Sequence, residues 1–117
     1  MTIEQKDKLI ALGVNLEETL ERFVDNENLY FRCLNKLLED KNYNDMMAAI
    51  DTGDASTAFD AAHALKGVSA NLGLNILYEE MKVITEVFRA GSLDYDADNL
   101  KRINDAYIQV IETIKSL

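Results

Sequence analysis

One stretch of the chain, AAHALKGVSANLGL from Ala61 to Leu74, contains its only histidine, His63. An imidazole exchanges its proton near physiological pH, so its unprotonated nitrogen can act as a nucleophile without an activating triad. Lys66 lies one helical turn further along and can neutralise the oxygens of a phosphoryl group. Gly67 destabilises a helix by about 1 kcal/mol relative to alanine, which makes sense where another molecule must approach closely. These residue types at this spacing predict a histidine that accepts a phosphoryl group.

The position of His63 on its helix supports the same prediction. With Ala62 set at 0° and about 100° added for each residue, one stripe of side chains falls within about 80° of Ala62 and faces the core. This stripe consists of Ala55, Ala58, Ala62, Leu65, Ser69 and Leu72. His63 lies at about 100°, Lys66 at about 40°, Ala70 at about 80° and Gly67 at about 140°. The imidazole is therefore expected at the border of core and solvent. It would lie beside the ammonium group of Lys66 and the space left by the missing side chain of Gly67.

The rest of the chain also has the pattern of helices joined by short loops. Proline is absent, and apolar residues recur at intervals of three and four. Thr2 can cap a short first helix that Gly13 ends, and Asn15 can cap a short second one. A longer helix is expected from Asn26 to about residue 39, and another over YNDMMAAI up to Gly53.

Asp54 then caps the helix that carries His63, and two long amphipathic helices follow. Their apolar side chains step by three and four along residues 74–88 and again along residues 100–117. Four long helices with short connections predict an all-α antiparallel four-helix bundle, with the short N-terminal helices as an addition to it. The length of 117 residues fits a single domain over 1–117.

The composition limits which partners the protein can have. Lys and Arg number 12 against 21 Asp and Glu, a net charge of −9, which disfavours nucleic acid and anionic membrane surfaces. No apolar run has the length of a membrane span or of a signal peptide, so a cytoplasmic protein is expected. The single cysteine, Cys33, falls in the apolar phase of LYFRCLNKLL and is interpreted as a small buried hydrophobe.

The segment HALKGVSANLG resembles the signature of histidine-containing phosphotransfer (HPt) domains, H-x-L-K-G-x-S-x-x-x-G. The segment GVNLEETLERFVDNENLYFRCLNKLLED is also similar to the leading helices of bacterial members, so the resemblance covers nearly the whole chain. It implies a helical bundle without catalytic activity of its own that exchanges phosphate with the aspartate of a receiver domain. His63 would be the phosphoacceptor, Lys66 the charge partner, Gly67 the access point and Gly73 the end of the helix.

The resemblance also bears on cofactors and on the surroundings of the imidazole. No intrinsic cofactor or metal is expected, and Mg²⁺ is expected to come with the receiver domain of a response regulator or hybrid histidine kinase. Several members of the family have a glutamine on the following helix that steadies the imidazole. The corresponding depth here holds Thr85, with Arg89 one turn further on.

The sequence suggests several contacts for a receiver. The short first helix has three apolar residues, Leu9, Ile10 and Leu12, more than one packed face needs, so some are expected to be exposed beside the histidine. The remaining candidates lie on the histidine helix and the next one, where basic side chains can form a polar rim. They are Ala64, Ala70, Lys82, Thr85 and Arg89. The protein is expected to act as a monomer.

A metal site is disfavoured, and two other interpretations stay open at this stage. Asp60 and His63 have the spacing of the carboxylate–histidine pairs in bundle metal sites, but a dinuclear site needs a second such pair and there is no other histidine. The chain could be the substrate domain of a chemotaxis-type or hybrid histidine kinase, phosphorylated by an ATP-binding domain. It could also be a helical interaction module that is not phosphorylated.

Overall fold

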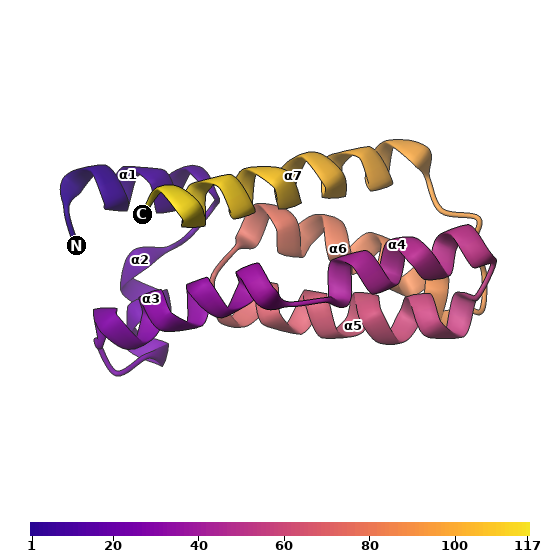
Figure 1. The fold of residues 1–117 in the computed structure, drawn as a ribbon, viewed down its shortest axis with the longest axis horizontal. Helices are drawn as coiled ribbons and strands as arrows, with labels where there is room; N and C mark the ends of the chain where they lie inside the picture. Colours follow the sequence, from indigo (N-terminus) through magenta and orange to yellow (C-terminus); the bar gives the residue numbers. More distant parts are fainter.

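The computed structural model describes residues 1–117 and consists of helices and short connections, with overall dimensions of 43 × 23 × 22 Å (Figure 1). The helices are α1 (Ile3–Ala11), α2 (Leu16–Arg22), α3 (Glu27–Lys36), the 3-10 helix η1 (Leu37–Glu39), α4 (Asn42–Thr52), α5 (Ala55–Asn71), α6 (Asn75–Arg89) and α7 (Ala97–Ser116). The predicted all-α fold is confirmed. None of these helices is both long and apolar enough to cross a membrane.

The bundle is formed by α5, α6, α7 and a fourth arm in which α3, η1 and α4 follow one another in nearly the same direction (Figure 1). Helix α5 packs against both α4 and α6, and α6 packs against α7. Each arm runs antiparallel to the next, as the short connections predict. Helix α1 lies beside the end of α7, where the Gln5 amide donates a hydrogen bond to the Leu117 carbonyl oxygen at 3.3 Å.

Local capping signals explain where most of these helices begin. The side chains of Thr2, Asn15, Asn26 and Asp54 each accept a hydrogen bond from the backbone N–H three residues later, as predicted. Asp54 also accepts a hydrogen bond from the Thr57 hydroxyl, and these bonds lower the pKa of its carboxyl group. Helix α5, which carries His63, therefore begins where its own sequence dictates.

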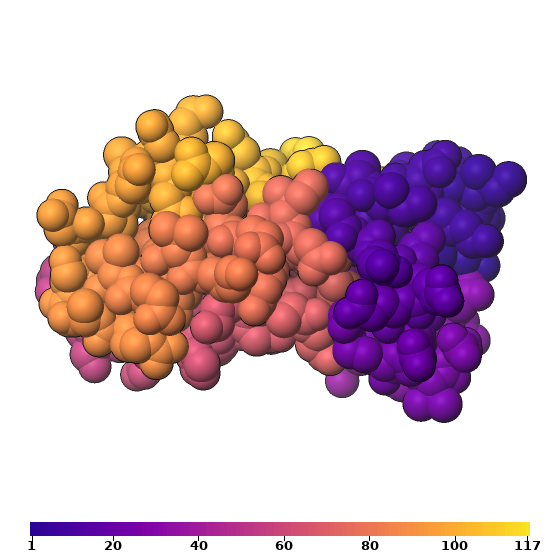
Figure 2. Space-filling model, turned by 180° about the vertical axis from the view of Figure 1, so that it is seen from behind, coloured from indigo at the N-terminus to yellow at the C-terminus, as the bar shows by residue number.

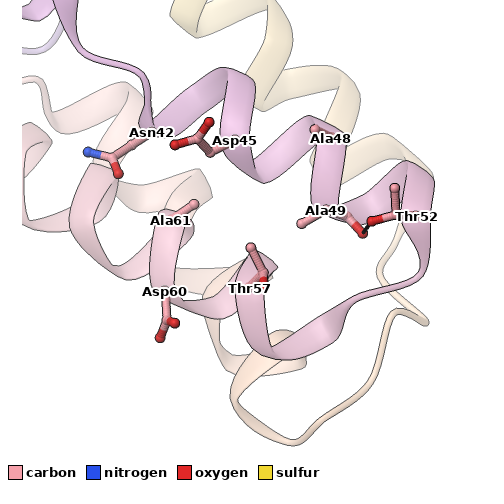
Figure 3. A pocket seen from close by; sticks show the side chains of 8 residues that line it. All are labelled: Asn42, Asp45, Ala48, Ala49, Thr52, Thr57, Asp60 and Ala61. Carbon is pink, nitrogen blue, oxygen red and sulfur yellow. Dashed lines mark hydrogen bonds between the residues drawn. The ribbon is translucent and has the colours of Figure 1, made fainter.

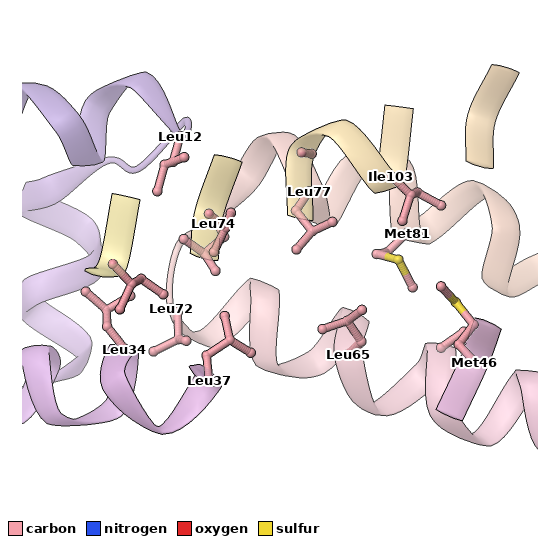
Figure 4. Close-up of a cluster of buried hydrophobic side chains, with 14 of the residues drawn as sticks. Leu12, Leu34, Leu37, Met46, Leu65, Leu72, Leu74, Leu77, Met81 and Ile103 are labelled. Carbon is pink, nitrogen blue, oxygen red and sulfur yellow. The ribbon is translucent and has the colours of Figure 1, made fainter. Parts of the chain in front are cut away.

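The core runs along the axis of the bundle and contains 23 buried apolar residues. Leu65 of α5 points inward toward Met46 of α4, Met81 of α6 and Ile103 of α7, so all four arms meet around it (Figure 4). The second half of the core, around Leu34, Leu72 and the start of α6, joins the N-terminal helices to the bundle. Cys33 has a free thiol and packs half-buried against this core.

The turn between α5 and α6 holds the N-terminal helices in place. Gly73 has φ +73°, and a Cβ there would collide with the Thr19 hydroxyl of α2, so the close approach of α2 requires a glycine. The buried Tyr30 hydroxyl of α3 donates to the Leu72 carbonyl oxygen at 2.8 Å, and burial raises the pKa of this phenol. Helices α2 and α3 are thereby fixed against the C-terminal end of the histidine helix.

Candidate functional site

His63 lies near the middle of α5 with its side chain exposed to solvent, as its helical angle predicts. No hydrogen bond or ion pair involves its ring. Lys66, one turn further along α5, is half-buried and forms no ion pair with any carboxylate of the chain. It is the only lysine or arginine of α5, and its free ammonium group remains available to an anion beside the imidazole.

Gly67 is exposed, and a Cβ added to it would meet nothing within 4 Å. Its position inside α5 also gives it no special backbone conformation to maintain. The chain itself thus gives no reason for a glycine here, although glycine destabilises a helix interior. The missing side chain leaves open surface next to His63, where a second molecule can come close to the helix.

Thr85 does not have the role that the sequence suggested. It is fully buried, and its hydroxyl donates to the Met81 carbonyl oxygen at 2.6 Å. The prediction that Thr85 contacts a partner is therefore wrong, because α6 turns this side chain toward the core. Its hydroxyl hydrogen is also already in use, so it does not replace the glutamine that steadies the imidazole in several HPt domains.

Lys82 and Arg89 are exposed on α6, as a partner contact requires, and each is held by a carboxylate of its own helix. The Lys82 ammonium lies 3.0 Å from Glu79, and this carboxylate raises the pKa of the lysine. The Arg89 Nε donates to both carboxylate oxygens of Glu86, at 3.0 and 3.2 Å. The two side chains are thus oriented rather than free, and they lie about one turn before and one turn after Thr85.

An aromatic contact beside the imidazole is a feature that the sequence analysis missed. The rings of Phe59 and His63 meet edge to face, with centroids 5.5 Å apart and planes at 85°. On the neighbouring helix α6, the Arg89 guanidinium lies over the Phe59 ring, 4.7 Å from its centroid. The spacing of four between Phe59 and His63 places them on one side of α5, and this spacing could have indicated the contact.

Asp60 is exposed and makes no hydrogen bond to His63. It lines a groove of about 410 Å³ on the other side of α5, between this helix and α4 (Figure 3). His63 is not among the residues that line this groove. No group of three or more histidine, cysteine, aspartate or glutamate side chains is arranged to hold a metal ion.

The first helix offers only one of its three predicted contacts. Leu9 and Leu12 are buried in the core, so the prediction that they meet a partner is wrong: the small N-terminal helices use these side chains to attach to the bundle. Ile10 is 55% exposed. The backbone of α1 ends against the start of α6, where the Ile76 N–H donates to the Leu12 carbonyl oxygen.

Helix α6 also has exposed apolar side chains. Ile76 and Val83 are about half exposed and lie seven residues apart, on the same outer face of α6. The view from behind shows the N-terminal helices adjoining α5 and α6 along one surface (Figure 2). We call Ile10, Ile76 and Val83 the apolar patch.

Ala64 and Ala70 are both half-buried on α5, so each presents part of its surface to solvent. Arg22, which reaches α5 from α2, could not be identified from the sequence. Its guanidinium donates to the Ala70 carbonyl oxygen at 3.1 Å, which adds an exposed cation to the site at the C-terminal end of α5. This placement depends on how α2 folds back onto the bundle, and no local pattern indicates it.

Comparison with known proteins agrees with this geometry. The family model described as Hpt domain matches residues 18–113, most of the chain. No curated protein and no solved structure matches the chain.

Proposed function

Since the chain belongs to the Hpt domain family, whose members carry phosphoryl groups in two-component signalling, we propose that His63 is its phosphoacceptor. It takes the group from the aspartate of one receiver domain and passes it to another. The observation that supports this most is the surface around His63: an exposed imidazole, the unpaired cation of Lys66 and the open space over Gly67. The protein works in the cytoplasm, as a monomer.

The chemistry needs little from this chain beyond a positioned nucleophile. The unprotonated ring nitrogen attacks the phosphorus of the aspartyl phosphate, and a nitrogen–phosphorus bond forms while the phosphorus–oxygen bond to aspartate breaks. The carboxylate leaves with the electron pair, and the proton on the other ring nitrogen stays there. Lys66 neutralises charge on the transferred oxygens, and the reverse reaction follows the same path.

The divalent cation of the reaction is part of the same proposal. Phosphoryl transfer commonly uses Mg²⁺ bound by carboxylates, and we assign its site to the acidic cluster of the receiver. Lys66 supplies a cation one turn from the imidazole that no carboxylate of this chain neutralises. The chain then has the role of a carrier, and the partner provides the metal.

The test is to mix the protein with a panel of purified, phosphate-labelled receiver domains and to follow the label over time. At least one receiver should lose its label to this protein within minutes when Mg²⁺ is present, and much more slowly after chelation. Calorimetry on the protein alone should detect no micromolar Mg²⁺ binding. A panel in which no receiver transfers its label, while a known phosphotransfer domain accepts it, would contradict the proposal.

Gly67→Ala should separate stability from transfer. The new methyl group meets nothing in the chain and replaces a poor helix former, so the free energy of unfolding should rise by about 0.5 to 1 kcal/mol. Transfer from a receiver should nevertheless slow, because the methyl group occupies the space beside His63. The measurements are chemical denaturation and the transfer rate of the same variant. A variant that is stabilised and transfers as fast as the parent would show that the space over Gly67 is not needed for the approach of a receiver.

Ile10→Asp should weaken receiver binding. The acidic protein and an acidic receiver site attract each other little at long range, so the interface depends on local apolar contacts such as the apolar patch. A charge at Ile10 should cost about 1 to 3 kcal/mol of binding while the fold stays intact, since this side chain is exposed.

Ile108→Asp is the matched control for this substitution. Ile108 is 52% exposed, close to the exposure of Ile10, but it lies on α7 in a groove with α4, away from the α5–α6 surface. Binding is measured by titration against the cognate receiver. Equal affinities for the two variants would mean that the patch does not take part in docking.

A further inference from the structure

The orientation of the His63 ring needs an explanation. An exposed side chain samples its rotamers within nanoseconds, whereas in-line transfer requires the nucleophile to be held near the phosphorus in a narrow range of angles. A hydrogen bond to the ring would fix it, but none is present. Thr85, at the position of the family's glutamine, is buried and bonded to the Met81 carbonyl oxygen. Asp60, one turn before His63, makes no hydrogen bond to it.

The imidazole does make an aromatic contact, with the ring of Phe59. This ring is half-buried and packs against the core, so it is less mobile than the exposed histidine. It meets the imidazole edge to face at 5.5 Å, within the range in which aromatic pairs attract each other beyond simple burial. A neighbour four residues earlier on the same helix face also occupies space into which the histidine ring could otherwise turn.

Phe59 is itself held from the neighbouring helix. The Arg89 guanidinium lies 4.7 Å from the centre of its ring, a distance typical of an attractive cation–π contact. Arg89 in turn donates from Nε to both oxygens of Glu86, one turn earlier on α6. The contacts thus run in sequence from Glu86 through Arg89 and Phe59 to the imidazole, and they connect α6 with α5.

We propose that Phe59 is the positioning residue for the His63 imidazole and that Arg89, oriented by Glu86, holds Phe59 in place. Aromatic packing across the α5–α6 contact then supplies the orientation that a hydrogen bond from α6 does not. The proposal rests on the proposed function of His63 as phosphoacceptor. Phe59 touches neither the phosphoryl group nor the receiver, and it acts through the geometry of the histidine.

Phe59→Leu tests the proposal, because leucine keeps an apolar side chain but removes the aromatic ring. His63 is the only histidine, so its two carbon-bound ring protons give unambiguous NMR signals. In the variant these signals should lose the ring-current shift from Phe59. The transfer rate at saturating phosphorylated receiver should fall about threefold to tenfold, while the receiver concentration for half-maximal rate changes less than about twofold. Phe59→Tyr keeps the ring and should restore both the signals and the rate.

Phe31→Leu is the control for a general loss of aromatic packing, since Phe31 is also half-buried but lies on α3. It should leave the His63 signals and the transfer rate at the parent values. Arg89→Gln should shift the His63 ring protons in the same direction as Phe59→Leu, to a smaller extent.

Two results would overturn the proposal: a folded Phe59→Leu protein with the parent transfer rate, or unchanged His63 ring protons in that variant. Failure of the proposed function would look different. In that case the parent protein itself would take no phosphate from any receiver, and the NMR comparison would still decide whether Phe59 orients the imidazole.

Discussion

Replacing His63 with glutamine should abolish phosphate uptake from every donor that phosphorylates the parent protein. Glutamine approximates the size and polarity of the imidazole but has no nucleophilic nitrogen. The side chain is exposed and makes no hydrogen bond, so the free energy of unfolding should stay within about 0.5 kcal/mol of the parent value. The measurement is the labelled phosphate retained by each protein after incubation with the same phosphorylated receiver.

The stability of the retained phosphate provides the control for this comparison. A phosphoramidate is labile in acid and stable in alkali, unlike the acyl phosphate of an aspartate. The parent protein should therefore lose its label in acid and keep it in alkali. Label that persists on the His63→Gln protein would mean that another residue is the acceptor.

Leu65→Ala should have the opposite effect to His63→Gln. The protein should lose much of its stability, while its phosphate uptake should change little. Leu65 is fully buried where α4, α5, α6 and α7 meet, and truncating it leaves a cavity that this packed core cannot fill (Figure 4). We expect the free energy of unfolding to fall by about 2 to 5 kcal/mol. Below its melting temperature, the variant should still accept phosphate, because His63 faces away from this part of the core.

Ile108→Ala is the matched control for Leu65→Ala. It removes a similar amount of apolar side chain from a position that is 52% exposed, so the expected change in stability is within about 0.5 kcal/mol. Chemical denaturation of both variants gives the comparison. A loss at Leu65 no larger than that at Ile108 would show that the four arms do not share a rigid core there.

Features that depend on neighbouring residues in the chain could be predicted from the sequence. Caps at Thr2, Asn15, Asn26 and Asp54 need only a side-chain oxygen and a backbone N–H three residues later. The exposure of His63 followed from the helical angle that separates it from the core stripe of α5. The helix caps and the exposure of His63 depend only on residues close in the chain, so the sequence pattern is enough to predict them.

Features that depend on packing between distant segments could not be predicted. Leu9 and Leu12 are buried because α1 lies against the ends of α6 and α7, a placement that no pattern within α1 specifies. Thr85 lies at the edge of the α6 stripe, and its burial depends on how α6 packs against its neighbouring helices. The Arg89–Phe59 contact likewise joins two helices.

A phosphorus NMR spectrum of the protein after transfer from a receiver shows whether His63 carries the phosphoryl group. Only one imidazole is present, so we expect a single phosphoramidate resonance with coupling to the carbon-bound ring protons of His63. The resonance should disappear when a second, unphosphorylated receiver is added. A phosphate ester or acyl phosphate resonance in its place, with unchanged His63 ring protons, would mean that His63 is not the phosphoacceptor.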